Sequence, residues 1–135
     1  MKTLALALIW IVTFSVTNAQ STDLIGTWNI IEYTNTSDGN EVKMSEAELN
    51  EEGSVWGLSF DDEKNVTQTS NMRTGSIETQ EGAWIKTDDE LTLELEMDER
   101  TIKLVYKYEL KDDILVLKRS NPTGTWKVAS TFKKQ

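Results

Sequence analysis

The sequence predicts an all-β fold, an eight-stranded antiparallel up-and-down barrel with one short helix in its first long loop. Apolar and polar residues alternate with a period of two through most of the chain, which is typical of strands that bury one face. Short polar segments separate these runs, as expected of hairpin turns. Only one segment has the features of a helix, and it is too short to be stable alone.

The first 19 residues have the three-part plan of a secretory signal peptide. Lys2 supplies a positive charge, residues 4–16 form an apolar stretch, and Thr17 and Ala19 are the small residues that an export peptidase requires. The apolar stretch is shorter than the ~20 residues that span a bilayer, which disfavours a membrane anchor. We expect cleavage after Ala19, a mature domain over residues 20–135, a secreted or periplasmic product, and no stable membrane insertion afterwards.

The first half of the mature domain contains four expected strands. They are residues 27–34, 54–60, 66–72 and 76–86. Gly26 precedes the first strand, and Trp56, Leu58 and Phe60 share one face of the second. The third strand carries Thr, Gln, Ser and Asn on both faces. It is either an edge or mouth strand in solvent, or a mixed wall suited to a ligand with apolar and hydrogen-bonding parts.

The long connection between the first two strands, residues 35–53, contains the helix candidate at residues 45–50. Ser45 can cap this helix, and Glu48, three residues later, can complete a capping box. The remainder of the connection is expected to be loop.

Alternation is most regular in the second half of the domain. Every second residue from Leu91 to Met97, and again from Ile102 to Leu110, is apolar or aromatic. The expected strands are residues 91–97, 102–110, 114–118 and 125–132. The connections after the first are short, which favours an up-and-down barrel over a sandwich with long cross-sheet connections.

Leu24-Ile25-Gly26-Thr27-Trp28 opens the mature domain, and its Gly-x-Trp triplet resembles the lipocalin signature. Over residues 23–133 the chain is similar to the small lipocalin-like domains of exported bacterial proteins. The resemblance implies a barrel base at Gly26 and Trp28, with Trp28 part of the core. It also implies that an arginine from the C-terminal part covers this indole, and Arg119 is the best match.

Several classes of function are disfavoured by composition. The chain has no histidine and no cysteine, which excludes Ser-His-Asp and Cys-His catalysis and thiolate or imidazole zinc sites. Its net charge is −9, and loss of Lys2 makes the mature domain more acidic still, so nucleic acid is a poor partner. The acidic clusters fall at expected turns, where solvated carboxylates are common. We therefore expect no catalytic residue, no metal ligand and no cofactor.

The leading functional hypothesis is a non-catalytic, monomeric binding protein with a small apolar or amphiphilic ligand in the barrel mouth. The candidate lining residues are Leu58, Phe60, Leu93, Leu95, Leu104 and Tyr106. The alternative is a protein-interaction module with a filled core, acting through loop 35–53 and its acidic surface. An internal void of about 300 Å³ or more would favour the carrier.

Overall fold

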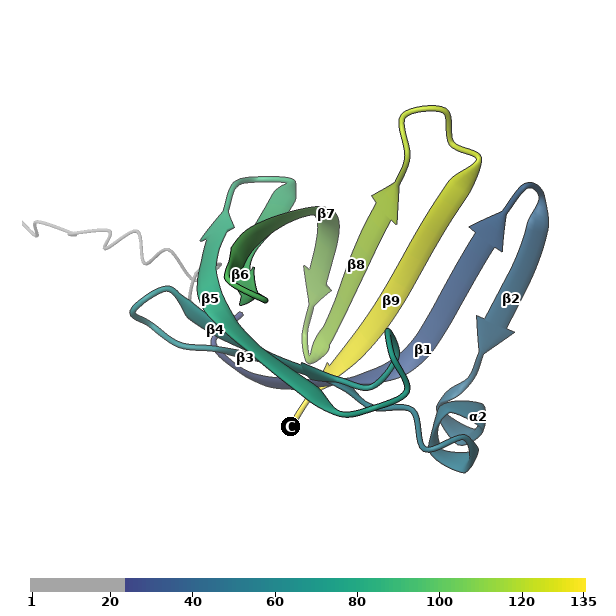
Figure 1. Ribbon diagram of the computed structural model, residues 1–135, viewed down its shortest axis with the longest axis horizontal. Helices are drawn as coiled ribbons and strands as arrows, with labels where there is room; N and C mark the ends of the chain where they lie inside the picture. The colour runs from purple at the N-terminus through teal and green to yellow at the C-terminus, as the bar shows by residue number, and fades with distance from the viewer. Residues whose placement is uncertain (1–23) are drawn as a thin grey trace, which may run out of the picture.

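The structure is a computed structural model that describes residues 24–135, where nine strands form one antiparallel sheet (Figure 1). The predicted signal peptide, residues 1–19, lies outside the described residues. The strands are β1 (Gly26–Ser37), β2 (Asn40–Met44), β3 (Trp56–Phe60), β4 (Asn65–Ser70), β5 (Glu78–Lys86), β6 (Glu90–Met97), β7 (Arg100–Lys111), β8 (Ile114–Ser120) and β9 (Trp126–Lys134). Strands β3 to β9 pair in chain order, and β1 pairs with both β3 and β9. The predicted up-and-down barrel of eight strands is thus confirmed.

Strand β2 is the ninth strand, and it corrects the expectation of a loop over residues 35–53. Strand β1 continues to Ser37, and β2 returns along it through a tight turn at Asp38-Gly39, where both residues have positive φ. Asp-Gly is a preferred pair for such a hairpin turn. The polar sequence of β2 concealed it, because four of its five residues are exposed and no buried face produces alternation.

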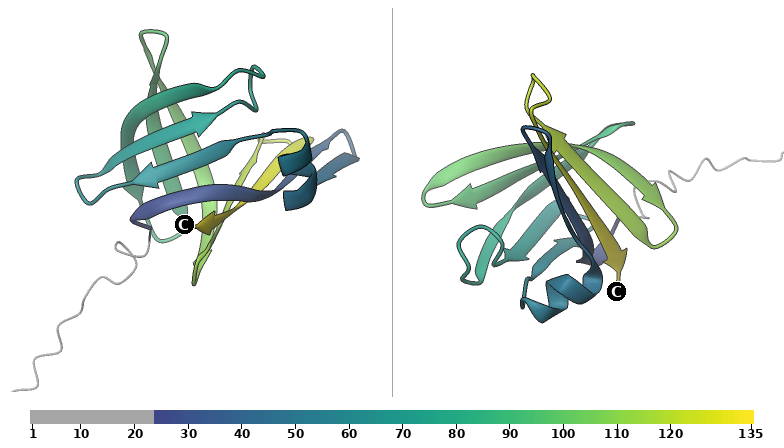
Figure 2. Two further views of the ribbon diagram at one scale, coloured as in Figure 1. Left: turned by 90° about the horizontal axis from the view of Figure 1, so that it is seen from below. Right: turned by 90° about the vertical axis from the view of Figure 1, so that its right-hand side faces the viewer.

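The predicted helix is confirmed as α2 (Glu46–Glu51), which lies outside the barrel beside the β1–β2 hairpin (Figure 2). Both halves of the capping box are present. The Glu48 amide donates to Ser45 Oγ at 3.3 Å, and the Ser45 amide donates to Glu48 Oε2 at 3.1 Å. Leu49 is the buried residue that attaches this short helix to the domain. Within residues 24–135, no helix is long and apolar enough to cross a membrane.

Strand β1 contains a bulge that changes which residues face the barrel interior. Its register against β9 shifts between Ile30 and Glu32. Because one extra residue reverses the alternation, Ile30 shares the inner face with Phe132 while Tyr33 shares it with Ser130. Before the bulge the even-numbered residues of β1 face the barrel interior, and after it the odd-numbered residues do.

One end of the barrel is closed by a solid apolar core. Its members are Leu24, Trp28, Leu58, Phe60, Val66, Trp84, Leu91, Leu93, Leu95, Leu115, Leu117 and Phe132, and the buried ring of Tyr106 packs with them at the border of the open half. Trp28 is fully buried, and its indole Nε1 donates to the Leu24 carbonyl at 2.8 Å. The ring of Trp84 packs edge-on against Phe60, with 5.7 Å between centroids. The prediction that Trp28 is core is confirmed.

The cation over Trp28 is Lys134, and the assignment of Arg119 to this place is wrong. Lys134 Nζ lies 5.5 Å from the Trp28 ring centroid. Gly26 allows this approach, because a Cβ there would lie 2.8 Å from Lys134 Cε and the residue has a φ of +135°. Arg119 is on the half of β8 that lies away from the base, since β8 runs from the closed end toward the open end.

The opposite end of the barrel is open because two strand pairs separate there. The pairing of β1 with β3 ends at Asn29↔Gly57, and the pairing of β7 with β8 ends at Lys107↔Lys118. Beyond these points β3–β7 form one wall, and β8, β9, β1 and β2 form the other (Figure 1). The space between the two walls is where a ligand site can form.

Candidate functional site

A cavity of about 350 Å³ lies between the two walls of the open half. One wall contributes Trp56 from β3 and a run of residues from β4 to β7, and the other contributes Tyr33, Arg119, Trp126 and Val128. The apolar part of the lining consists of Met72, Met97, Ile102, Leu104 and Val128. Tyr33, Trp56, Tyr106 and Trp126 add aromatic surface to this lining.

A chain of polar side chains crosses the wall formed by β3, β4 and β5. Trp56 Nε1 donates to Gln68 Oε1 at 3.0 Å, and Gln68 Nε2 donates to Gln80 Oε1 at 3.2 Å. Gln80 Nε2 in turn donates to Glu78 Oε2 at 3.2 Å. Gln68 and Gln80 are directly opposite each other in the sheet, which explains why their amides meet. We call Trp56, Gln68, Gln80, Glu78 and Arg73 the polar ladder.

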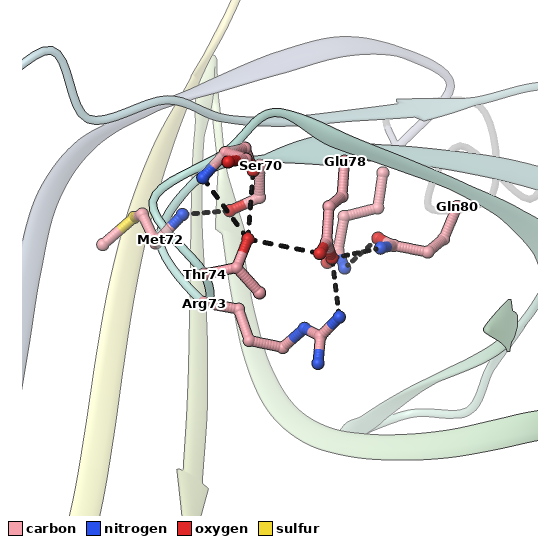
Figure 3. Close-up of polar contacts among 8 residues, drawn as sticks. Ser70, Met72, Arg73, Thr74, Glu78 and Gln80 are labelled. Carbon is pink, nitrogen blue, oxygen red and sulfur yellow. Dashed lines mark hydrogen bonds and ion pairs between the residues drawn. The ribbon is translucent and has the colours of Figure 1, made fainter. Parts of the chain in front are cut away.

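The outer end of the polar ladder is an ion pair at the loop between β4 and β5 (Figure 3). Arg73 Nη2 lies 2.7 Å from Glu78 Oε2, and Thr74 Oγ1 donates to Glu78 Oε1 at 3.2 Å. The Arg73 contact, with help from Thr74 and Gln80, holds the pKa of Glu78 below its usual value. The ladder therefore presents fixed, mutually satisfied dipoles to the cavity.

Arg119 is on the facing wall, between two aromatic rings. Its Cζ lies 5.5 Å from the Tyr106 ring centroid and 5.6 Å from that of Trp126. Burial raises the pKa of Tyr106, an effect that the nearby Arg119 charge partly offsets. Tyr106 is therefore a neutral phenol at neutral pH and keeps its hydrogen-bond donor. Arg119 forms no ion pair within residues 24–135.

The structure separates the six predicted lining residues into two groups. Leu104 and Tyr106 line the cavity. Leu58, Phe60, Leu93 and Leu95 are buried in the solid core of the closed half and are not lining residues. Alternation identifies the inward face of a strand, but it carries no information about height along the barrel, which caused the error.

Several cavity residues were not proposed from the sequence. Met97 and Ile102 continue the predicted inward rows toward the open end, so that signal was present. Tyr33 was hidden by the bulge in β1, because simple alternation from Trp28 puts it on the outer face. Trp126 lies within the last predicted strand, residues 125–132, but no site was proposed there.

No group of three or more acidic side chains that could hold a metal ion is found among the residues that the structure describes. The acidic residues between β6 and β7, and between β7 and β8, lie in tight turns as predicted: Asp98 and Glu99 in the first and Asp112 in the second have positive φ.

The profile of the lipocalin-like domain family matches residues 24–117 of the chain. The chain belongs to the lipocalin-like domain family. No curated protein matches it. Among solved structures, this lipocalin-like domain is similar to a lipocalin-like protein from Bacteroides uniformis, with 20% identity, 84% of this chain and 99% of that chain covered, and a TM-score of 0.54. An uncharacterized protein from Bacteroides eggerthii has the same identity and TM-score, with 83% and 99% covered. These likenesses support the barrel fold.

The family match ends at Leu117, within β8. Arg119, Trp126 and Val128, which form much of the second wall of the cavity, lie after this point. Their arrangement is therefore derived from the geometry of this chain and not from the family.

Proposed function

We propose that the mature chain is an exported, non-catalytic binding protein that holds one small amphiphilic molecule in the open half of its barrel. The observation that carries this proposal is the cavity of about 350 Å³ with an apolar floor and a polar ladder along one wall. Ligand pockets in proteins are typically about 300–1,000 Å³ and combine apolar surface with a few fixed polar groups.

The division of the barrel into two halves supports this proposal. The closed half buries Trp28, Trp84 and Phe132 completely and can supply most of the stability. The open half keeps partly exposed side chains such as Trp56, Met97 and Leu104 beside its cavity. A protein with no ligand would be expected to fill this space, because close packing is the usual state of an interior.

The alternative of an interaction module assumed a filled interior and a loop over residues 35–53. The interior is filled in the closed half only, and the segment forms β2 and α2. The cavity therefore favours the carrier.

Binding of the neutral fluorescent probe N-phenyl-1-naphthylamine tests the proposal. We expect saturable binding of one probe per chain, with quenching or energy transfer from the cavity residues Trp56 and Trp126. Leu104→Trp should abolish this binding, because the larger side chain fills the cavity. Ile85→Trp is the matched control, since Ile85 lies on β5 and is 53% exposed. Absence of binding to the wild type, or equal binding to both variants, would contradict the proposal.

A further inference from the structure

The wall of the barrel is split between β7 and β8 in its open half. The last paired residues are Lys107 and Lys118, and the next pair in register would be Tyr106 and Arg119. Instead the strands diverge at this point (Figure 1). The side chains of Tyr106 and Arg119 meet across the split, with Arg119 Cζ 5.5 Å from the ring centroid.

An outer groove of about 490 Å³ follows this split on the outside of the barrel. Its lining includes Lys107, Lys118 and Lys127. The register puts Glu90, Lys107, Lys118, Ala129 and Thr34 in one row across five strands, so they share the outer face. Arg119 and Val128 line both the outer groove and the inner cavity. Arg119 therefore lies at the passage between the two.

The split is a positive site in an acidic protein. The whole chain has a net charge of −9, yet three lysines and Arg119 surround this opening. Glu90 is the carboxylate in the groove lining, and Glu109 pairs with Lys118 at 3.4 Å. Lys107, Lys127 and Arg119 form no ion pair with any carboxylate of the described residues. This arrangement leaves cationic groups available to an anion.

We propose that the split between β7 and β8 is an anion-recognition site, which selects an amphiphile with a carboxylate head and a single apolar tail. The inference rests on the proposed function. The tail occupies the inner cavity, and the carboxylate binds Arg119 in the split wall, facing the basic outer groove. A guanidinium binds a carboxylate through two parallel charge-assisted hydrogen bonds.

Two features of the site favour this recognition. Tyr106 and Trp126 flank the guanidinium and restrict its motion, which reduces the entropy lost when an anion binds. The polar ladder on the opposite wall already contains its own ion pair between Arg73 and Glu78, so that cation is less available. Of the two arginines in the cavity lining, Arg119 is therefore the one available to form an ion pair with a ligand.

Decanoate and decanol, compared as competitors of N-phenyl-1-naphthylamine, separate head-group recognition from tail binding. We expect decanoate to bind the wild type at least about tenfold more tightly than decanol. Arg119→Gln should lower the ratio of decanoate affinity to decanol affinity by about tenfold or more, and Arg119→Lys should give an intermediate ratio. Lys111→Gln is the charge-matched control, because this exposed lysine is at the other end of β7. It should behave as the wild type.

The outcomes distinguish the inference from the proposed function. Equal affinities for decanoate and decanol, or the same selectivity in Arg119→Gln as in the wild type, would overturn the anion site and leave the carrier intact. If neither compound nor the probe binds, both proposals fail. An unchanged thermal midpoint shows that Arg119→Gln is folded. If that variant does not fold, the Arg119→Lys variant decides: unchanged decanoate selectivity there would overturn the bidentate contact.

Discussion

At Gly82 the backbones of two neighbouring strands lie so close together that one added methyl group should destabilise the fold. It lies on β5 opposite Leu95 of β6. A Cβ at this residue would overlap the carbonyl oxygen of Glu94, and it would lie 2.8 Å from the Glu94 carbonyl carbon and 3.0 Å from Leu95 Cα. All three atoms belong to the backbone, so no side-chain rotation can relieve the overlap.

The cost of Gly82→Ala follows from this geometry. Strands β5 and β6 must separate locally, which distorts ladder hydrogen bonds worth about 0.5–1.5 kcal/mol each. The shift also disturbs the packing of Leu93 and Leu95, which are fully buried, and overpacking of a core typically costs about 1–3 kcal/mol. We therefore expect the free energy of unfolding to fall by about 2–4 kcal/mol.

Urea denaturation followed by tryptophan fluorescence measures this change. Gly57→Ala on β3 is the matched control, because its Cβ would meet the Asn29 side-chain oxygen at 3.1 Å and that side chain can move. Alanine also reduces the entropy of the unfolded chain, so the control should change the stability by less than about 1 kcal/mol in either direction. If Gly82→Ala is as mild as Gly57→Ala, the reasoning about backbone approach is refuted.

Two further predictions concern polar groups of the open half and its border. The pKa of Glu78 is lowered, chiefly by Arg73. A carboxyl with a lowered folded-state pKa stabilises the fold above its unfolded-state pKa, and this contribution disappears as the pH falls through the folded-state value. The stability difference between the wild type and Glu78→Gln should therefore narrow on acidification, and a constant difference in denaturation midpoints from neutral to acidic pH would contradict this. Ser130 Oγ is buried without a hydrogen-bond partner in the described region, so Ser130→Ala should leave the free energy of unfolding unchanged or raise it by up to about 1 kcal/mol, whereas a loss above 1 kcal/mol would show a missed partner.

The strands and the helix were predictable because their signals are local. Alternation along β6 and β7 depends on residues two apart, and the capping box of α2 depends on residues three apart. The chain-order pairing of β3 to β9 also followed from short polar connections. Strand β2 had a local signal in Asp38-Gly39, but its exposed residues gave no apolar pattern to support it.

The site was only half predictable because it depends on distances along the barrel. Leu93 and Leu104 are paired neighbours with the same inward orientation, yet the first is core and the second lines the cavity. Which of them meets solvent depends on where the walls separate. That separation is a property of the whole sheet.

The sequence by itself determined eight of the nine strands, the inward faces of most of them, the helix α2 and the acidic composition, since each depends on the residues themselves or on neighbours close in the chain. Only the tertiary structure decided that Lys134 covers Trp28 and that Arg119 lies in the split wall. Lys134 lies over Trp28 because of the register between β1 and β9, which come from opposite ends of the domain. Arg119 lies in the split because the pairing of β7 with β8 ends at Lys107 and Lys118. A shift of one residue in strand pairing would exchange the inner and outer faces of a strand. Contacts between distant strands are therefore fixed only when the barrel closes.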